Sequence, residues 1–117
     1  MTAAERRAQL DEGRRLFNGR EFWRAHEVLE TVWRSIIRDS PEALVWQGFI
    51  QAAAALLHQE RRNRHGVETV GAAALEKLNG PQHPAVEFEM PHFRAQLARA
   101  LTGEGDPPKL EYRTTDA

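Results

Sequence analysis

Hydrophobic residues recur every three or four positions along most of the chain, which is the spacing of one face of an α-helix. Capping residues, glycines and prolines divide this pattern into segments. The sequence therefore predicts helices over residues 2–18, 21–38, 41–62, 66–78 and 91–101. The alternation of period two that marks a half-buried strand is missing from the sequence.

The third predicted helix is apolar around most of its circumference. A helix of this kind lies buried at the centre of a domain. We therefore predict an all-α fold, an antiparallel bundle of three main helices with an accessory N-terminal and a C-terminal helix. Residues 1–103 are expected to form a single helical domain, and residues 104–117, which begin with glycines and prolines, a flexible C-terminal tail.

Composition narrows the classes of function. The chain has 117 residues, a formal net charge of -1 and no cysteine. The lack of cysteine excludes disulfides, thiolate metal sites and cysteine nucleophiles, and it suits a cytoplasmic protein. The near-zero charge argues against nucleic acid as a partner. No apolar run has the length of a membrane span or of a signal peptide, so we expect a soluble protein without a membrane partner.

Two sets of polar side chains interrupt the apolar faces. One set shares a face of the second predicted helix, with spacings of four and three residues: His26, Glu30 and Trp33. The other set follows a narrow stripe of the third helix, with spacings of four and seven residues: Gln47, Gln51 and His58. If the two helices form an antiparallel hairpin, the sets face each other. We therefore predict a polar cluster inside the domain, with Glu27 at its edge.

This cluster has two interpretations. In the first, it is a buried hydrogen-bond network that fixes the register of the two helices, because a buried polar group without a partner costs about 1–3 kcal/mol. In the second, His26, Glu30 and His58 bind a divalent metal, and Gln51 or water completes the coordination shell. Such a metal would open the way to metal-assisted hydrolysis.

A third candidate site is basic. Arg61, Arg62 and Arg64 lie next to the predicted start of the fourth helix, at the corner formed by residues Arg61–Gly66. Cations beside the free N–H groups of a helix N-terminus hold a phosphate or a carboxylate. The sequence therefore also permits an anion-binding module at this corner.

The polar positions belong to a longer pattern. The run from Phe17 to Trp33 resembles the signature FN-xxx-F-xx-AHE-xx-E-xx-W of a widespread prokaryotic family, known only as a domain of unknown function, number three hundred and nine. The run from Gln47 to His58 is similar to the second part of that signature, QG-xx-Q-xAA…H. The resemblance covers about residues 16–78. It implies a compact helical fold and assigns no reaction.

The sequence thus predicts a small helical domain of uncharacterised function that works through a protein partner or as a small homo-oligomer. Whether the chain is an enzyme stays open. The alternatives are a domain that binds a metal or small ligand at the cluster of histidine, glutamate and glutamine, and the anion-binding module.

Overall fold

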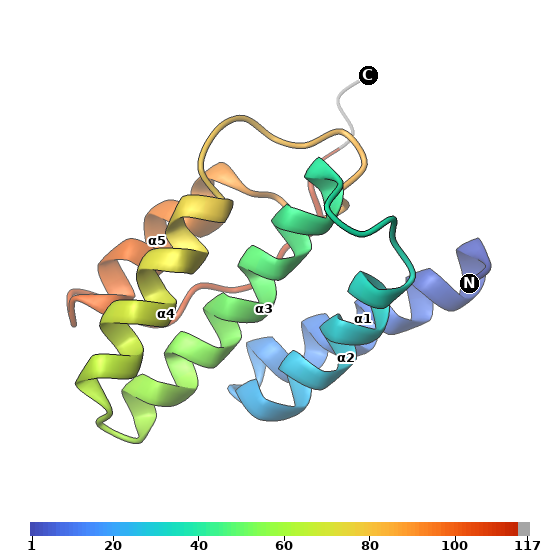
Figure 1. Ribbon diagram of the computed structural model, residues 1–117. Helices are drawn as coiled ribbons and strands as arrows, with labels where there is room; N and C mark the ends of the chain where they lie inside the picture. The colour runs from blue at the N-terminus through green and yellow to red at the C-terminus, as the bar shows by residue number, and fades with distance from the viewer. Residues whose placement is uncertain (115–117) are drawn as a thin grey trace.

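The chain folds into five helices over residues 1–114, the part that the computed structural model describes. These helices are α1 (Ala3–Asn18), α2 (Phe22–Arg34), α3 (Pro41–Glu60), α4 (Arg64–Lys77) and α5 (Pro91–Leu101). Successive helices run antiparallel (Figure 1). The all-α fold predicted from the sequence is confirmed.

The helix α3 lies at the centre of the molecule. It packs against α2 on one side and α4 on the other, and α5 also contacts it (Figure 1). The side chains of Trp46 and Phe49 on α3 are fully buried. The ring of Phe49 contacts Phe88 and Phe93, with centroids 5.8 and 5.0 Å away. The apolar circumference therefore predicts the position of this helix correctly. No helix in residues 1–114 combines the length and the apolar character needed to cross a membrane.

Local capping fixes the starts of α1 and α3. The Thr2 hydroxyl accepts a hydrogen bond from the Glu5 backbone N–H at 3.0 Å, and the Glu5 carboxylate accepts one from the Thr2 N–H at 3.1 Å. The Ser40 hydroxyl accepts a hydrogen bond from the Ala43 N–H at 3.1 Å, with Pro41 in the first turn. Both starts agree with the sequence prediction.

The helix α2 ends earlier than the apolar pattern predicts. It stops at Arg34 instead of continuing to residue 38. The Ser35 hydroxyl donates a hydrogen bond to the Val32 carbonyl at 2.6 Å, and Asp39 adopts a left-handed conformation with φ of 64°. The resulting loop leaves Ile37 82% exposed, although its spacing places it on the predicted apolar face.

Residues 107–114 pack against the domain as a strap, although the sequence predicts them as part of a flexible tail. Leu110 is 0% exposed. The Asn18 side chain holds this residue from both sides: its Oδ1 accepts from the Leu110 N–H at 2.7 Å, and its Nδ2 donates to the Leu110 carbonyl at 3.1 Å. Tyr112 pairs with Phe88 in an antiparallel bridge. Residues 115–117 of the predicted tail lie outside the described part of the chain.

Candidate functional site

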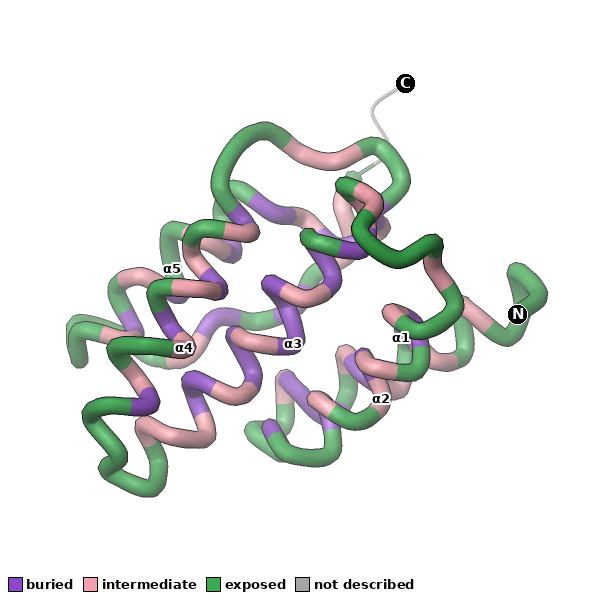
Figure 2. Tube along the Cα trace, viewed as in Figure 1, coloured by how far each residue is buried: buried purple, intermediate pink, exposed green. Residues whose placement is uncertain are grey.

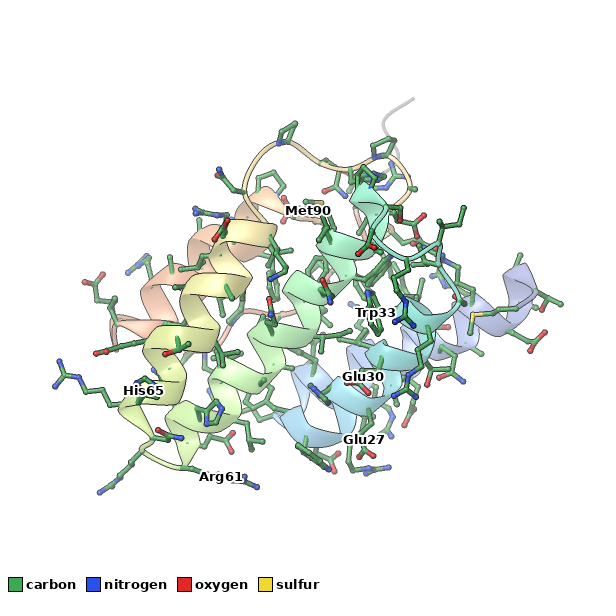
Figure 3. The ribbon with its side chains drawn as sticks, viewed as in Figure 1. Glu27, Glu30, Trp33, Arg61, His65 and Met90 are labelled. Carbon is green, nitrogen blue, oxygen red and sulfur yellow. The ribbon has the colours of Figure 1, made fainter. Side chains whose placement is uncertain are left out.

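Polar and aromatic side chains gather on one side of the α2–α3 pair. Figure 2 shows half-buried positions along the side of α3 that lies between α2 and α4, and Figure 3 shows Glu30 and Trp33 on the same side of the molecule. We call this surface the α2–α3 face. Its main residues are Trp23, His26 and Glu30 on α2, and Leu44, Gln47 and Gln51 on α3.

A chain of contacts runs along α2. The indole of Trp23 lies flat against the imidazole of His26, with ring centroids 5.4 Å apart and planes 8° from parallel. His26 Nε2 lies 3.5 Å from Glu30 Oε1. The other oxygen of Glu30 lies 3.2 Å from the Arg34 guanidinium. The side chains of His26 and Glu30 are 22% and 30% exposed, so this part of the predicted cluster lies at the surface and outside the core.

The predicted buried network does not form. Within residues 1–114, no polar or charged residue is buried as a whole. Two buried side-chain atoms of the α2–α3 face have no hydrogen-bond partner there: His26 Nδ1 and Gln51 Oε1. The hypothesis of a fully satisfied network is therefore wrong, because these two atoms are shielded from solvent without being paired.

Three further members of the predicted cluster differ in their exposure. Trp33 is half-buried against the core, and the Arg38 guanidinium lies 5.7 Å from the centre of its ring. Gln47 is half-buried on α3, and Glu27 is exposed on α2 (Figure 3). The half-buried polar residues of the face are thus His26, Glu30, Gln47 and Gln51.

His58 belongs to the turn between α3 and α4. Its Nδ1 lies 3.1 Å from the Asn63 side-chain amide. A Cβ added to Gly66 would lie 2.5 Å from the His58 ring, so the imidazole packs directly on the backbone of α4. The His58 ring is thus held at the α3–α4 turn by local contacts, where its spacing along α3 alone predicts a position in the cluster.

The predicted metal ligands do not come together. Across the described residues, no group of three histidine, aspartate or glutamate side chains is placed to hold an ion. His26 and Glu30 are in contact, but His58 is engaged with Asn63. The structure therefore corrects the hypothesis that these three side chains bind one metal ion. Helix spacing alone gives no information on the direction of the His58 side chain.

Some groups of the predicted anion-binding corner already have partners within the domain. Arg61, Arg62 and Arg64 are exposed, as expected for cations that meet a ligand. However, the Asn63 side-chain oxygen caps α4 by accepting a hydrogen bond from the Gly66 N–H at 3.1 Å. Arg64 forms an ion pair with Glu68 at 3.0 Å. The helix N-terminus therefore has its own cap, and a ligand at this corner would depend on the arginine side chains.

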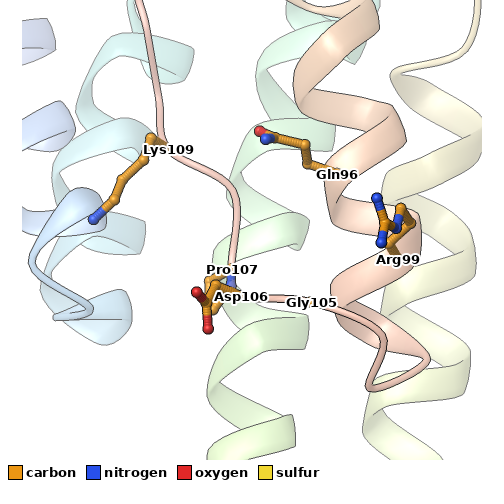
Figure 4. Close-up of a pocket in the computed structure, with 6 residues that line it drawn as sticks. All are labelled: Gln96, Arg99, Gly105, Asp106, Pro107 and Lys109. Atoms are coloured by element: carbon orange, nitrogen blue, oxygen red, sulfur yellow. The ribbon is translucent and has the colours of Figure 1, made fainter.

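A hollow of about 360 Å³ lies between the end of α5 and the strap (Figure 4). Its polar lining includes Gln96, Arg99 and Lys109. These groups diverge: the Lys109 ammonium donates a hydrogen bond to the Asn18 carbonyl at 2.9 Å, away from Arg99 (Figure 4). The hollow thus lacks a set of polar groups that converge on one ligand. Sequence reasoning missed it because it forms only when the strap is docked.

Comparison with known proteins places the chain among uncharacterised relatives. The sequence model of a family described as Domain of unknown function (DUF309) matches residues 10–70. An uncharacterised protein of Aquifex aeolicus is 34% identical over 106 residues, which cover 88% of this chain and 31% of that protein. The uncharacterised protein YpuF of Bacillus subtilis is 37% identical over 70 residues, which cover 58% of this chain and 38% of YpuF. The chain therefore spans about a third of the length of these relatives.

Proposed function

The chain belongs to the DUF309 family, whose function is unknown, and we propose that it is a cytoplasmic protein-interaction domain that binds its partner through the α2–α3 face. The observation that carries the proposal is the pair of buried, unpaired polar atoms on this face, His26 Nδ1 and Gln51 Oε1. A buried polar atom without a partner generally costs about 1–3 kcal/mol of stability. A role in binding explains why polar side chains occupy these positions.

Other residues of the family-like signature have a role in the fold. Asn18 holds the strap at Leu110. Gly48 allows close packing, because a Cβ at this position would lie 2.9 Å from the Leu78 side chain. His58 packs on Gly66. His26 and Gln51 keep unpaired atoms instead, and this contrast supports a role in binding for them.

The exposed side chains of the face suit a protein partner. Trp23 is 56% exposed and is held flat against His26, so its large apolar surface is ordered before a partner arrives. Leu44 on α3 is 45% exposed. Tryptophan is enriched among the residues that dominate binding energy in protein interfaces, and an ordered side chain loses little entropy on binding. The lack of cysteine supports the cytoplasmic part of the proposal.

Photo-crosslinking in the native host tests the proposal. Trp23 and Leu44 are replaced one at a time by p-benzoylphenylalanine, and Thr31, exposed on α2 outside the face, serves as the matched control position. We expect irradiation to link positions 23 and 44 to one and the same protein, identified by mass spectrometry, and position 31 to link to none.

The adduct also identifies the kind of partner. A product that contains two copies of this chain supports the proposal in its homo-oligomeric form, and light scattering of the purified protein should then show a dimer or larger assembly. If both positions link to one and the same different protein, the result supports the proposal with that protein as the partner. The proposal is contradicted if positions 23 and 44 form no adduct, or if position 31 forms adducts as abundant as theirs.

A further inference from the structure

We propose that a groove between α4 and α5 binds an acidic amphipathic helix of a partner protein. This surface is separate from the α2–α3 face, because it is formed by α4, α5 and the end of α3 with the turn that follows it. The inference therefore goes beyond the function proposed above and does not depend on it.

The groove has apolar walls on two antiparallel helices. A hollow of about 260 Å³ is lined mainly by apolar side chains, Val67, Ala72 and Leu75 on α4 and Ala98 and Leu101 on α5, and its polar lining is Glu68 and Thr102. A second hollow of about 310 Å³ shares Val67 and Leu101 with the first, so the two form one continuous groove. Its floor is narrow, because the helices touch where a Cβ on Gly71 would lie 2.9 Å from the Leu101 side chain.

The shape of the groove fits a helix. Its wall on α4 extends from Val67 to Leu75, about 12 Å or two helical turns. Ala72 has a small side chain and Gly71 has none, so the backbone of an incoming helix can approach closely. An amphipathic helix places apolar side chains at i, i+3 or i+4, and i+7 into such a groove.

The charges at one end select an acidic partner. Arg62 and Arg64 line the second hollow, beside Gln59. The carboxylate of Glu68, which lines the first hollow, is paired with Arg64. Arg62 and its neighbour Arg61 form no ion pair with any residue in the range 1–114. Guanidinium groups bind carboxylates through strong, charge-assisted hydrogen bonds. An acidic helix whose apolar face fills the groove would place carboxylates beside these arginines. The basic corner then acts through its side chains, since Asn63 caps the helix N-terminus.

The test uses a stapled helical peptide of about 15 residues with leucines on one face and glutamates elsewhere, and a twin with lysine for each glutamate. Binding to the full chain is measured by fluorescence anisotropy. We expect the acidic peptide to bind at least about tenfold more tightly than its basic twin, and its affinity to fall as salt is raised.

Two variants locate the peptide on the molecule. Ala72→Glu adds a negative charge inside the groove and should weaken binding of the acidic peptide by about tenfold or more. Thr69→Glu makes the same change in charge at an exposed position of α4 outside the groove and should change the affinity by less than about twofold. Circular dichroism confirms that both variants are folded.

Three outcomes would overturn the proposal: equal binding of the two peptides, equal effects of the two α4 variants, or binding of phosphatidylglycerol vesicles in place of the acidic peptide. Trp23→Ala removes the exposed ring of the α2–α3 face and should leave peptide binding unchanged. Failure of this proposal is therefore distinguishable from failure of the proposed function, which the crosslinks at positions 23 and 44 test alone.

Discussion

At the scale of single residues, a buried acceptor without a partner is expected to lower the stability of the free domain, and Gln51 supplies one. Its Oε1 is buried and accepts no hydrogen bond from the described residues. Leucine has a similar volume and no polar atom, so Gln51→Leu removes the unpaired acceptor and keeps the packing. We expect this variant to raise the free energy of unfolding by about 1 kcal/mol. Urea denaturation followed by circular dichroism measures the change.

Gln47→Leu is the matched control, because Gln47 lies one turn away on the same stripe of α3 and its side-chain atoms are not buried without a partner. We expect a change of less than about 0.5 kcal/mol for it. A loss of stability in Gln51→Leu of about 1 kcal/mol or more would contradict the prediction. It would mean that the Gln51 amide is hydrogen-bonded in the folded protein, as in the network that the sequence alone suggests.

At the scale of helices, the sequence predicts the starts of α1 and α3 better than the end of α2. The starts of α1 and α3 depend on side chains within three residues of the cap, such as Thr2 with Glu5, so they are legible without tertiary structure. The end of α2 depends on a hydrogen bond from Ser35 to the preceding turn. The apolar spacing continues through Ile37 and therefore predicts a longer helix.

Within the candidate site, too, the sequence predicts what depends on local spacing and misses what depends on contacts with other elements. Helix periodicity is enough to place His26 and Glu30 on one face, where they are in contact. It gives no information on the rotation of the His58 ring toward Asn63, which depends on the next turn of the chain. It also gives none on the exposure of Trp23, which is decided by which helices cover α2.

At this scale, the contact between His58 and Gly66 at the α3–α4 turn predicts the effect of a substitution on stability. Gly66 lies inside the first turn of α4, where alanine would favour the helix by about 1 kcal/mol. In this fold, however, the added Cβ would lie 2.5 Å from the His58 ring. We expect Gly66→Ala to lower the free energy of unfolding by about 2 kcal/mol because of overpacking. In a His58→Ala background, we expect the same substitution to be neutral or stabilising.

The reversal between the two backgrounds is the decisive measurement, because it isolates the contact from the helix preference of alanine. Denaturation of the wild type, the two single variants and the double variant gives the coupling energy. An equal loss in both backgrounds would show that His58 does not pack on Gly66. In that case His58 would be available to the α2–α3 face.

At the scale of the whole molecule, the strap joins segments that are far apart in the sequence. Leu110 is fully buried and is held by Asn18 at the end of α1, while Tyr112 pairs with Phe88 in the loop before α5. The strap thus closes the bundle on the side of α3 opposite the α2–α3 face (Figure 1). Its composition alone predicts a flexible tail, because glycines precede it, two prolines begin it and its partners lie in other elements.

Tyr112 reports whether the strap is docked. Burial, together with a hydrogen bond from its hydroxyl to the Asp11 carboxylate, raises the pKa of Tyr112 to about 12. A tyrosine in an unfolded chain titrates near about 10. The raised pKa means that docking stabilises the neutral phenol. This contribution is complete below about pH 10 and is lost as the pH rises through about 12.

Because Tyr112 is the single tyrosine of the sequence, the near-ultraviolet absorbance of tyrosinate follows this group alone. We expect the folded protein to titrate near pH 12 and the protein in denaturant near about 10. Asp11→Asn should lower the pKa of Tyr112 in the folded protein while leaving it above that of the unfolded chain, because burial is the larger cause. If Tyr112 of the folded wild type titrates at about pH 10, the strap is undocked. The contacts between Leu110 and Asn18 would then not hold the bundle together.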